Sequence, residues 1–399
     1  MKKLIYLCCT MLLCLNTVAQ IDPDDQNWEC VLCDDFNETN RQFDNSFQEP
    51  LGKWISYAHS LWPSGVTKIP LKHIYQWDKC LIDATDGVIK LNSNFIRSTS
   101  ITCSEQANYY DLPPNTFGMN YHCDADNREL YYYSGMIETV PTNKFRYGYF
   151  EIKCKLPVHR GAFPAFWLWG AKDNEYYEEI DIFEFSWDFE NPASTEWTHN
   201  PHPHGEGNPY CFTSGLYINN QTESLSPIDS TSQARVYSMI NDSLNHWHTF
   251  SCEWLPDHIL WYCNGNLVNV YNNPDSIPSH PLTLKANYAI DRYALHDYHS
   301  GNIPEWLGSD VMSIDYIKVY QLDWDCSTDE TITQQSELDN FDFAVKRRIA
   351  ITSAIEPVGI GNDEKATFRA TDSFEITGPF QVDNGGELTI IMQSCPNPE

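Results

Sequence analysis

The sequence predicts an all-β protein, and two observations carry that prediction. Many short runs alternate apolar and polar residues, which is the period-two pattern of strands with one buried face. No stretch shows the apolar spacing of a long amphipathic helix. The chain has 399 residues, of which 42% are hydrophobic. It is therefore long enough for one large β domain and a smaller unit.

Residues 1–19 have the features of a secretory signal peptide. Two lysines precede an apolar run over residues 4–15 that is too short to span a bilayer comfortably, and small residues end the segment. We expect cleavage before Gln20 and a secreted or cell-surface protein. Lipid attachment at Cys14 is a minor alternative, because large leucines stand before it. No later stretch is long and apolar enough to predict a membrane span.

The formal charge of −30 argues against nucleic acid and anionic membranes as partners. It also argues weakly against a highly sulfated substrate, although local basic residues would override the long-range field. Eleven of the 14 cysteines follow the signal segment. Export favours disulfides, and an odd number leaves at least one cysteine unpaired within the chain. The CxxC over residues 30–33 has no second close pair beside it, so it predicts a zinc or redox site only weakly.

Alternating residues over 80–100 predict strands, and residues 103–130 predict a long surface loop. The next predicted strand, residues 163–170, carries two tryptophans at period two. Trp167 and Trp169 therefore share a face. That face belongs either to the core or to a platform on which sugar rings stack.

The segment over residues 175–187 is rich in acidic, β-branched and aromatic residues, and predicts a strand. Glu179 and Asp181 point to one side, and the isoleucines that follow each of them point to the core. Glu184 breaks this parity. One inserted residue, a β-bulge at Ile182-Phe183, brings Glu184 back to the face of Glu179, and bulges often lie beside active sites.

Three acids so close together repel one another, so the pKa of one carboxyl must rise. A carboxylate beside a protonated carboxylic acid is what retaining glycoside hydrolysis requires. The alternative is an acidic edge strand with a solvated face.

Three histidines fall within six positions at residues 199–204. Neutral histidine is a common metal ligand, but only Glu206 stands nearby as a further ligand. Contact of His204 with sugar hydroxyls, or a plain surface loop, is the favoured interpretation. Further along, two alternating runs around Pro256-Asp257 predict a β-hairpin.

After Leu322 the character of the sequence changes. Residues 323–341 are polar, acidic and without periodicity, and predict a linker. Residues 342–399 predict a small β-rich module. Because so small a module needs help to stay folded, a Cys326–Cys395 bridge is one expectation. The predicted strands of the module are residues 349–351, 366–369, 374–376 and 388–391.

The run Glu-Ile-Asp-Ile-Phe-Glu over residues 179–184 resembles the Glu-x-Asp-x-x-Glu signature of glycoside hydrolase family 16 in its β-bulge form. That branch includes laminarinases, agarases, porphyranases and κ-carrageenases. The resemblance implies that Glu179 is the nucleophile and Glu184 the acid/base. Asp181 is then the helper between them.

Other motifs follow in the family's order from about Cys33 to Tyr320. They include Tyr-Gly-Tyr-Phe-Glu at residues 147–151 and Phe-Trp-Leu-Trp at residues 166–169. The resemblance implies a concanavalin-like jelly-roll sandwich of two antiparallel sheets with an open cleft, occupying residues 20–322. No cofactor is expected to be required.

The resemblance also assigns roles to single residues. It favours a sugar-stacking platform for Trp169, leaves both interpretations open for Trp167, and gives Glu151 a structural role. Some members of the family bind a structural calcium ion through an aspartate that corresponds to Asp315, which is one carboxylate and not a complete site. Glu178 stands where laminarinases usually have glycine, which weakens a specific assignment as a laminarinase.

We therefore expect a secreted, monomeric, endo-acting hydrolase that cleaves a β-linked polysaccharide, either a β-1,3-glucan or a marine galactan, with retention. A non-catalytic carbohydrate-binding protein and a transglycosylase are the alternatives on the same sandwich. Degenerate binding proteins typically lose one catalytic acid, whereas all three are present here. A purely structural surface protein leaves the clustered acids and paired tryptophans unexplained.

Overall fold

In the computed structural model of the protein, the residues described are 27–37, 53–55, 76–77, 82–85, 87–102, 128–140, 142–157, 162–171, 176–185, 210–220, 235–240, 245–290 and 311–396. The predicted signal segment, most of the predicted loop over residues 103–130, and His204 lie outside these residues.

The described residues are almost entirely β-structure, which confirms the predicted fold class. The helical elements among them are the short 3-10 helix η3 (Pro274–Ser276) and the helix α2 (Gln335–Leu338). No helix among these residues has both the length and the apolar character needed to cross a membrane.

The strand that carries the acids lies in a sheet of order β11-β10-β9-β8-β15-β6, here called the acid sheet, in which all neighbours are antiparallel. Short strands β2 and β3 join it at β6. The strands are β2 (Trp54–Ile55), β3 (Gln76–Trp77), β6 (Arg128–Thr139), β8 (Ala162–Ala171), β9 (Tyr176–Glu184), β10 (Tyr210–Asn220), β11 (Arg235–Ile240) and β15 (Thr283–Ile290).

A second antiparallel sheet has the order β5-β16-β7-β12-β13-β14 and is called here the module sheet. Strand β1 pairs with β16 and β4 with β5. The predicted hairpin is confirmed as β12 and β13. The strands are β1 (Trp28–Asp34), β4 (Ile82–Thr85), β5 (Val88–Thr102), β7 (Gly148–Lys155), β12 (His248–Trp254), β13 (Ile259–Cys263), β14 (Asn266–Tyr271) and β16 (Val311–Leu322).

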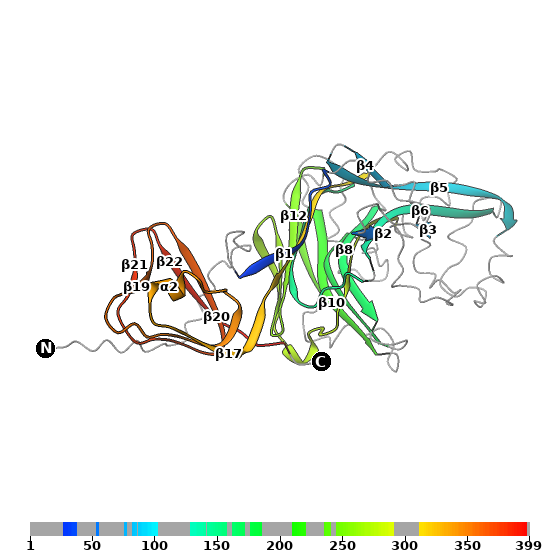
Figure 1. Ribbon diagram of the computed structural model, residues 1–399. Coiled ribbons are helices and arrows are strands. Elements are labelled where there is room, and N and C mark those ends of the chain that lie inside the picture. Colours follow the sequence, from blue (N-terminus) through cyan, green and yellow to red (C-terminus); the bar gives the residue numbers. More distant parts are fainter. Residues whose placement is uncertain are drawn as a thin grey trace.

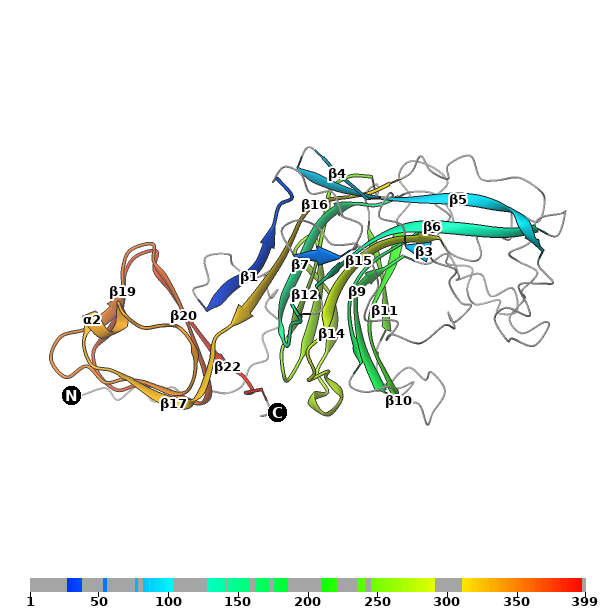
Figure 2. The ribbon, with the colours of Figure 1, turned by 45° about the vertical axis from the view of Figure 1, so that its right-hand side comes forward.

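The two sheets pack face to face, and hydrogen bonds between β5 and β6 join them at one edge (Figures 1 and 2). Phe183 of the acid sheet lies with its ring centroid 4.4 Å from that of Phe250 of the module sheet. Both rings are fully buried in one aromatic-rich core. The predicted sandwich of two antiparallel sheets is thereby confirmed.

The C-terminal module has a different architecture, because its strands are parallel. β17, β18, β20 and β22 form one parallel sheet, and β19 and β21 form a second parallel pair. The chain therefore coils so that successive strands stack, as Figure 1 shows at its left. Cys326 and Cys395 form the expected disulfide across this coil. The strands are β17 (Trp324–Ile332), β18 (Val345–Ile351), β19 (Val358–Ile360), β20 (Lys365–Ile376), β21 (Phe380–Val382) and β22 (Glu387–Met392).

The prediction that residues 323–341 form a linker is wrong, because these residues are part of the folded module. β17 and α2 both fall within residues 323–341, and β17 pairs in parallel with β18. The exposed face of β17 is polar, which hid its strand character, whereas Ile332 and Leu338 are buried in the core of the module.

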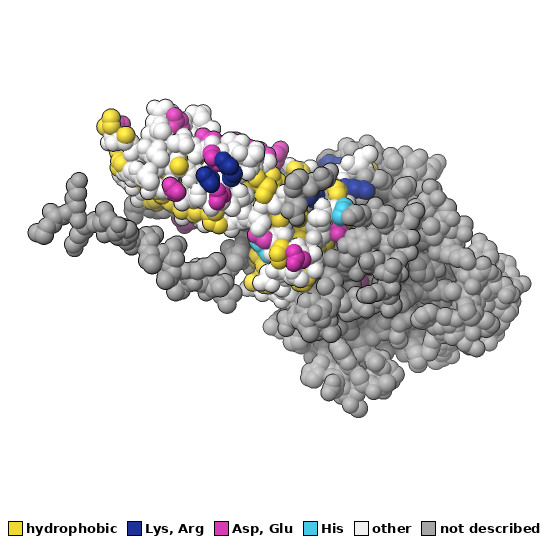
Figure 3. Space-filling model, turned by 90° about the horizontal axis from the view of Figure 1, so that it is seen from below, with side chains coloured by type: hydrophobic (Ala, Val, Ile, Leu, Met, Phe, Trp, Pro, Cys, Tyr) yellow, Lys and Arg dark blue, Asp and Glu magenta, His cyan; other side chains and the backbone are white. Residues whose placement is uncertain are grey.

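The module packs against the outward side of the module sheet. Trp28, Tyr149, Tyr262 and Leu322 of the sandwich form one buried cluster with Val345 of the module. The backbone N–H of Ser394 also donates to Asp257 Oδ2 (3.0 Å) in the β12–β13 turn. In Figure 3, hydrophobic side chains spread over both the module and the adjoining part of the sandwich.

Candidate active site

The acid strand β9 keeps its carboxyl groups on one face of the acid sheet. The carboxyl residues Glu179, Asp181 and Glu184 lie opposite every second residue of β8, namely Trp169, Trp167 and Ala165 in that order. Since residues two apart on a regular strand share a face, the three carboxyl residues share the face of the two tryptophans.

A β-bulge at Ile182 produces this arrangement. The pairing of β9 with β8 passes from Asp181 directly to Phe183, and the pairing with β10 shifts over the same stretch. The predicted bulge is therefore confirmed, and Glu184 lies on the same side as Glu179. The bulge also directs a backbone carbonyl into the sandwich, where the indole Nε1–H of Trp261 donates to the Asp181 carbonyl (2.8 Å). That bond satisfies a polar group that would otherwise lose its sheet partner.

The acids differ in burial. Asp181 is only 3% exposed, whereas Glu179 and Glu184 are half-buried. Glu178, the acid that departs from the laminarinase pattern, alternates to the opposite side of the strand. There its Oε2 lies 3.4 Å from both the backbone nitrogen and Nδ1 of His280. Glu178 is thus not a fourth carboxyl on the acid face.

Trp167 and Trp169 lie beside the acids on the neighbouring strand, as expected of a platform for sugar rings. Trp167 is half-buried, and its Nε1–H donates to Asn287 Oδ1 (2.8 Å) on β15, which fixes the orientation of the ring. Trp169 is 9% exposed. The register places both indoles on the outward face of the acid sheet with the acids, and a platform for sugar rings there stays a prediction.

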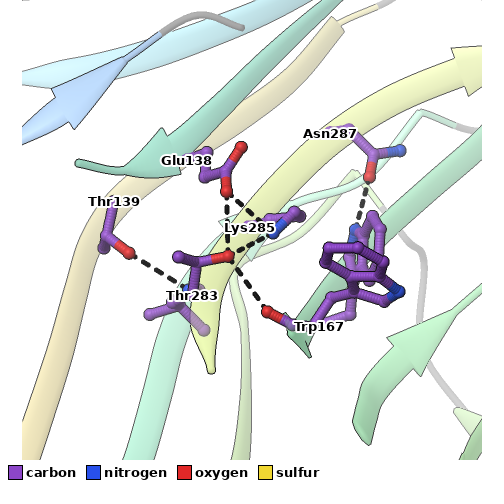
Figure 4. Close-up of polar contacts among 8 residues, drawn as sticks. Glu138, Thr139, Trp167, Thr283, Lys285 and Asn287 are labelled. Carbon is purple, nitrogen blue, oxygen red and sulfur yellow. Dashed lines mark hydrogen bonds and ion pairs between the residues drawn. The ribbon is translucent and has the colours of Figure 1, made fainter. Parts of the chain in front are cut away.

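A buried ion pair lies next to the tryptophans. Lys285 on β15 donates to Glu138 Oε1 on β6 (2.9 Å), and both side chains have no exposed surface. Lys285 also donates to the hydroxyl of Thr283, which donates in turn to Glu138 Oε1 (2.8 Å), as Figure 4 shows. The same hydroxyl lies 3.1 Å from the carbonyl oxygen of Trp169. The Lys285 ammonium lies 5.2 Å and 5.5 Å from the ring centroids of Trp167 and Trp169.

Burial lowers the pKa of Lys285, since it disfavours the ammonium form. Glu138 opposes that effect through its charge and its hydrogen bond, and the charge of Glu179 opposes it further. The ammonium of Lys285 and the carboxylate of Glu179 therefore attract each other.

Two other residues singled out from the sequence lie on the module sheet. Glu151 is 6% exposed and accepts hydrogen bonds from the hydroxyls of Tyr149 (3.2 Å) and Tyr316 (2.7 Å). It is on the opposite sheet from the acid strand. The carboxylate of Asp315 lies 2.7 Å from the ammonium of Lys153.

The neighbours of Asp315 do not fit a calcium site. Nowhere in the part of the chain that the structure describes do three or more His, Cys, Asp or Glu residues gather in a way that would hold a metal ion. An ammonium already neutralises Asp315, and calcium takes six to eight oxygen ligands. The calcium ligand stays a prediction that the described residues do not support.

The residues that the sequence did not reveal are Glu138, Thr283, Lys285 and Asn287. A local signal existed for the last three, because lysine, threonine and asparagine alternate with apolar residues at 283–288. Glu138, the partner of Lys285, is 147 positions away in the sequence, so only the pairing of β15 with β6 brings the two residues together.

The fold and the acid face are those expected of a glycoside hydrolase of this class. Residues 98–292, about half of the chain, match the family model described as glycosyl hydrolases family 16.

Curated relatives resemble this chain over about half its length. The endo-1,3-1,4-beta-glycanase EglC of Rhizobium meliloti (strain 1021) is 26% identical over 201 residues, which are 50% of this chain and 36% of that protein. The kappa-carrageenase of Pseudoalteromonas carrageenovora is 25% identical over 210 residues, which are 50% of this chain and 45% of that protein. The chain spans less than half the length of each of these two relatives.

Solved structures are similar at lower identity. The laminarinase catalytic domain of Thermotoga petrophila RKU-1 superposes with a TM-score of 0.45 at 18% identity, covering 74% of this chain and 98% of that one.

Proposed function

We propose that the protein is a secreted, endo-acting β-glycan hydrolase that works with retention of configuration. The observation that carries this proposal is the bulge in β9, which gathers Glu179, Asp181 and Glu184 on one face beside two tryptophans. The match of residues 98–292 to the family 16 model supports the reaction class.

The reaction has two displacements. In the first, a carboxylate oxygen of Glu179 attacks the anomeric carbon, while the carboxylic acid of Glu184 gives its proton to the departing glycosidic oxygen. In the second, Glu184 takes a proton from water, whose oxygen attacks the same carbon and releases Glu179. Asp181 lies between the two and orients Glu179. We expect the carboxyl groups of Glu179 and Glu184 to lie about 5–5.5 Å apart, the separation of retaining enzymes.

The proposed substrate is a β-1,3-glucan or a marine galactan. Among the relatives, one is named an endo-1,3-1,4-beta-glycanase and another a kappa-carrageenase. Both names support a β-linked polysaccharide, and Trp167 and Trp169 offer rings for stacking on pyranose faces.

A reducing-sugar assay over laminarin, mixed-linkage glucan, agarose, porphyran and carrageenan tests the proposal. The wild-type protein should release oligosaccharides from at least one of these, and the E179Q variant should be at least about a thousandfold slower while keeping its fold. Full activity in E179Q, or no activity of the wild type on any glycan, would refute the proposal. Product analysis separates hydrolysis from transfer to a sugar acceptor.

A further inference from the structure

A contribution to stability does not by itself explain the buried ion pair of Lys285 and Glu138. Both side chains have no exposed surface. Removing two charges from water costs several kcal/mol per ion, and well-packed apolar residues often serve a core equally well or better. The position of the pair therefore calls for another explanation.

The pairing of the strands places the cation nearer to the acids than the anion. Glu138 lies opposite Lys285, Lys285 opposite Trp167, and Trp167 opposite Asp181, all in one row across the acid sheet. Neighbouring strands are about 4.8 Å apart. Lysine is therefore two strands, or about 10 Å, from the acid strand, whereas Glu138 is three strands away. The net field of the pair at the acid strand is positive.

The same ammonium also contacts both rings of the platform. Its distances of 5.2 Å and 5.5 Å from the centroids of Trp167 and Trp169 are within the range of cation–π attraction. The hydroxyl of Thr283 links the pair to the backbone of Trp169, the residue directly opposite Glu179.

We propose that Lys285, held by Glu138 beneath Trp167 and Trp169, is a positioning residue of the acid strand, whose buried positive charge keeps Glu179 ionised and ready to attack. This inference rests on the proposed function and deepens it. Glu138 orients the ammonium and prevents an unpaired buried cation. Both side chains of the pair have no exposed surface, so the interaction of Lys285 with the acid strand is weakly screened.

The charged groups that act on Lys285 come from three directions. Glu138 on β6 and Glu179 on β9 favour its ammonium form, and Lys144, in the segment before β7, acts against it. Because the attraction is mutual, the charge of Lys285 favours the carboxylate form of Glu179 to the same degree. Asp181 and Glu184 on β9 are the like charges that Lys285 must offset there.

The test measures the ionisation of Glu179 directly, by carboxyl carbon-13 titration of the full chain, with the signal assigned from its loss in E179Q. In K285M we expect the pKa of Glu179 to move upward by about one pH unit, because a unit charge about 10 Å away is removed. The acidic limb of the kcat/KM profile should move by the same amount. The double variant K285M/E138L replaces both charges with apolar groups, so it leaves no unpaired buried carboxylate that would destabilise the fold. It should show a smaller shift in the same direction.

Lys346 provides the matched control. It is 3% exposed and pairs with Asp325 and Asp342, but it lies in the C-terminal module. K346M should leave the titration of Glu179 unchanged.

A purely structural role of Lys285 would lower stability without moving the titration. The inference is overturned if Glu179 titrates as in the wild type in folded K285M, or in the double variant where K285M does not fold. It is also overturned if K346M produces the same shift. If the wild type hydrolyses no glycan but the pKa of Glu179 still rises in K285M, the proposed function is refuted and the electrostatic assignment stands.

Discussion

The outward faces of the two sheets differ in what their buried glutamates do. On the acid sheet, Glu138 is paired with the cation Lys285 beside a row of further acids. On the module sheet, Glu151 accepts hydrogen bonds from tyrosine hydroxyls, and the aromatic residues around it continue into the contact with the C-terminal module. Strand alternation supplies an outward face in both sheets. The bulge and the buried cation distinguish one face, for which we propose catalysis, while tyrosines on the other face contribute to docking of the C-terminal module.

Among the substitutions that test the difference between the two faces, the largest effect on activity is expected on the acid face. E184Q should slow hydrolysis of a natural glycan by at least about a thousandfold, because the leaving oxygen then departs without a proton. With an aryl glycoside whose leaving group needs no proton, the first step should be far less affected. Steady-state and burst kinetics on both substrates measure the difference. Equal losses on the two substrates would contradict the role of Glu184 as the acid.

The second effect concerns the module. Cys326 and Cys395 close a loop with a sequence separation of 69. The variant with both cysteines replaced by serine should lose about 4 kcal/mol of the free energy of unfolding of the module. Glycan hydrolysis at 25 °C should not change, since the acid sheet lies on the other side of the sandwich. Denaturant unfolding and limited proteolysis measure the loss, and a parallel fall in activity would show that the two faces are coupled.

The third effect is a pH dependence of the docking contact. Burial alone would lower the pKa of His258, but the carboxylates of Asp257 and Glu253, each 2.8 Å away, raise it to about 9. A raised pKa adds stability that is complete below about pH 6.5 and is lost as the pH rises through 9. The contribution is at most about 3 kcal/mol.

Asp257 also accepts a hydrogen bond from the Ser394 backbone N–H of the module. The deprotonation of His258 at high pH should therefore weaken the contact between the module and the β12–β13 turn. Thermal melts between pH 6 and pH 10 measure it. The H258Q variant is the control, and an unchanged pH dependence in H258Q would assign the effect to another group.

The smallest effect is expected at Glu151. In E151Q the amide oxygen still accepts from one tyrosine hydroxyl and the amide N–H can donate to the oxygen of the other, so stability should fall by only about 1 kcal/mol. Because Glu151 is on the opposite sheet from the acid strand, kcat/KM should stay within about twofold of the wild type. A loss of activity without a loss of stability would contradict its structural role.

The sequence predicted those features that depend on local order. Parity along residues 175–187 was enough to locate the bulge, and alternation located the tryptophans and the hairpin. It could not reveal the partner of Lys285, because a contact between β6 and β15 depends on the topology of the sheet. It also failed at β17, where a strand with a polar outward face reads as a linker until its parallel neighbour is known.

The hydrogen bond from Trp261 to the Asp181 carbonyl ties the bulge of the acid strand to the opposite sheet. The bulge sets the spacing of Glu179 and Glu184, and it is held by an indole that belongs to the other layer. Under the proposed mechanism, any sliding of one layer over the other would change the distance between the proposed nucleophile and the proposed proton donor. The proposed reaction would then depend on the rigidity of the aromatic interior as well as on the acid face.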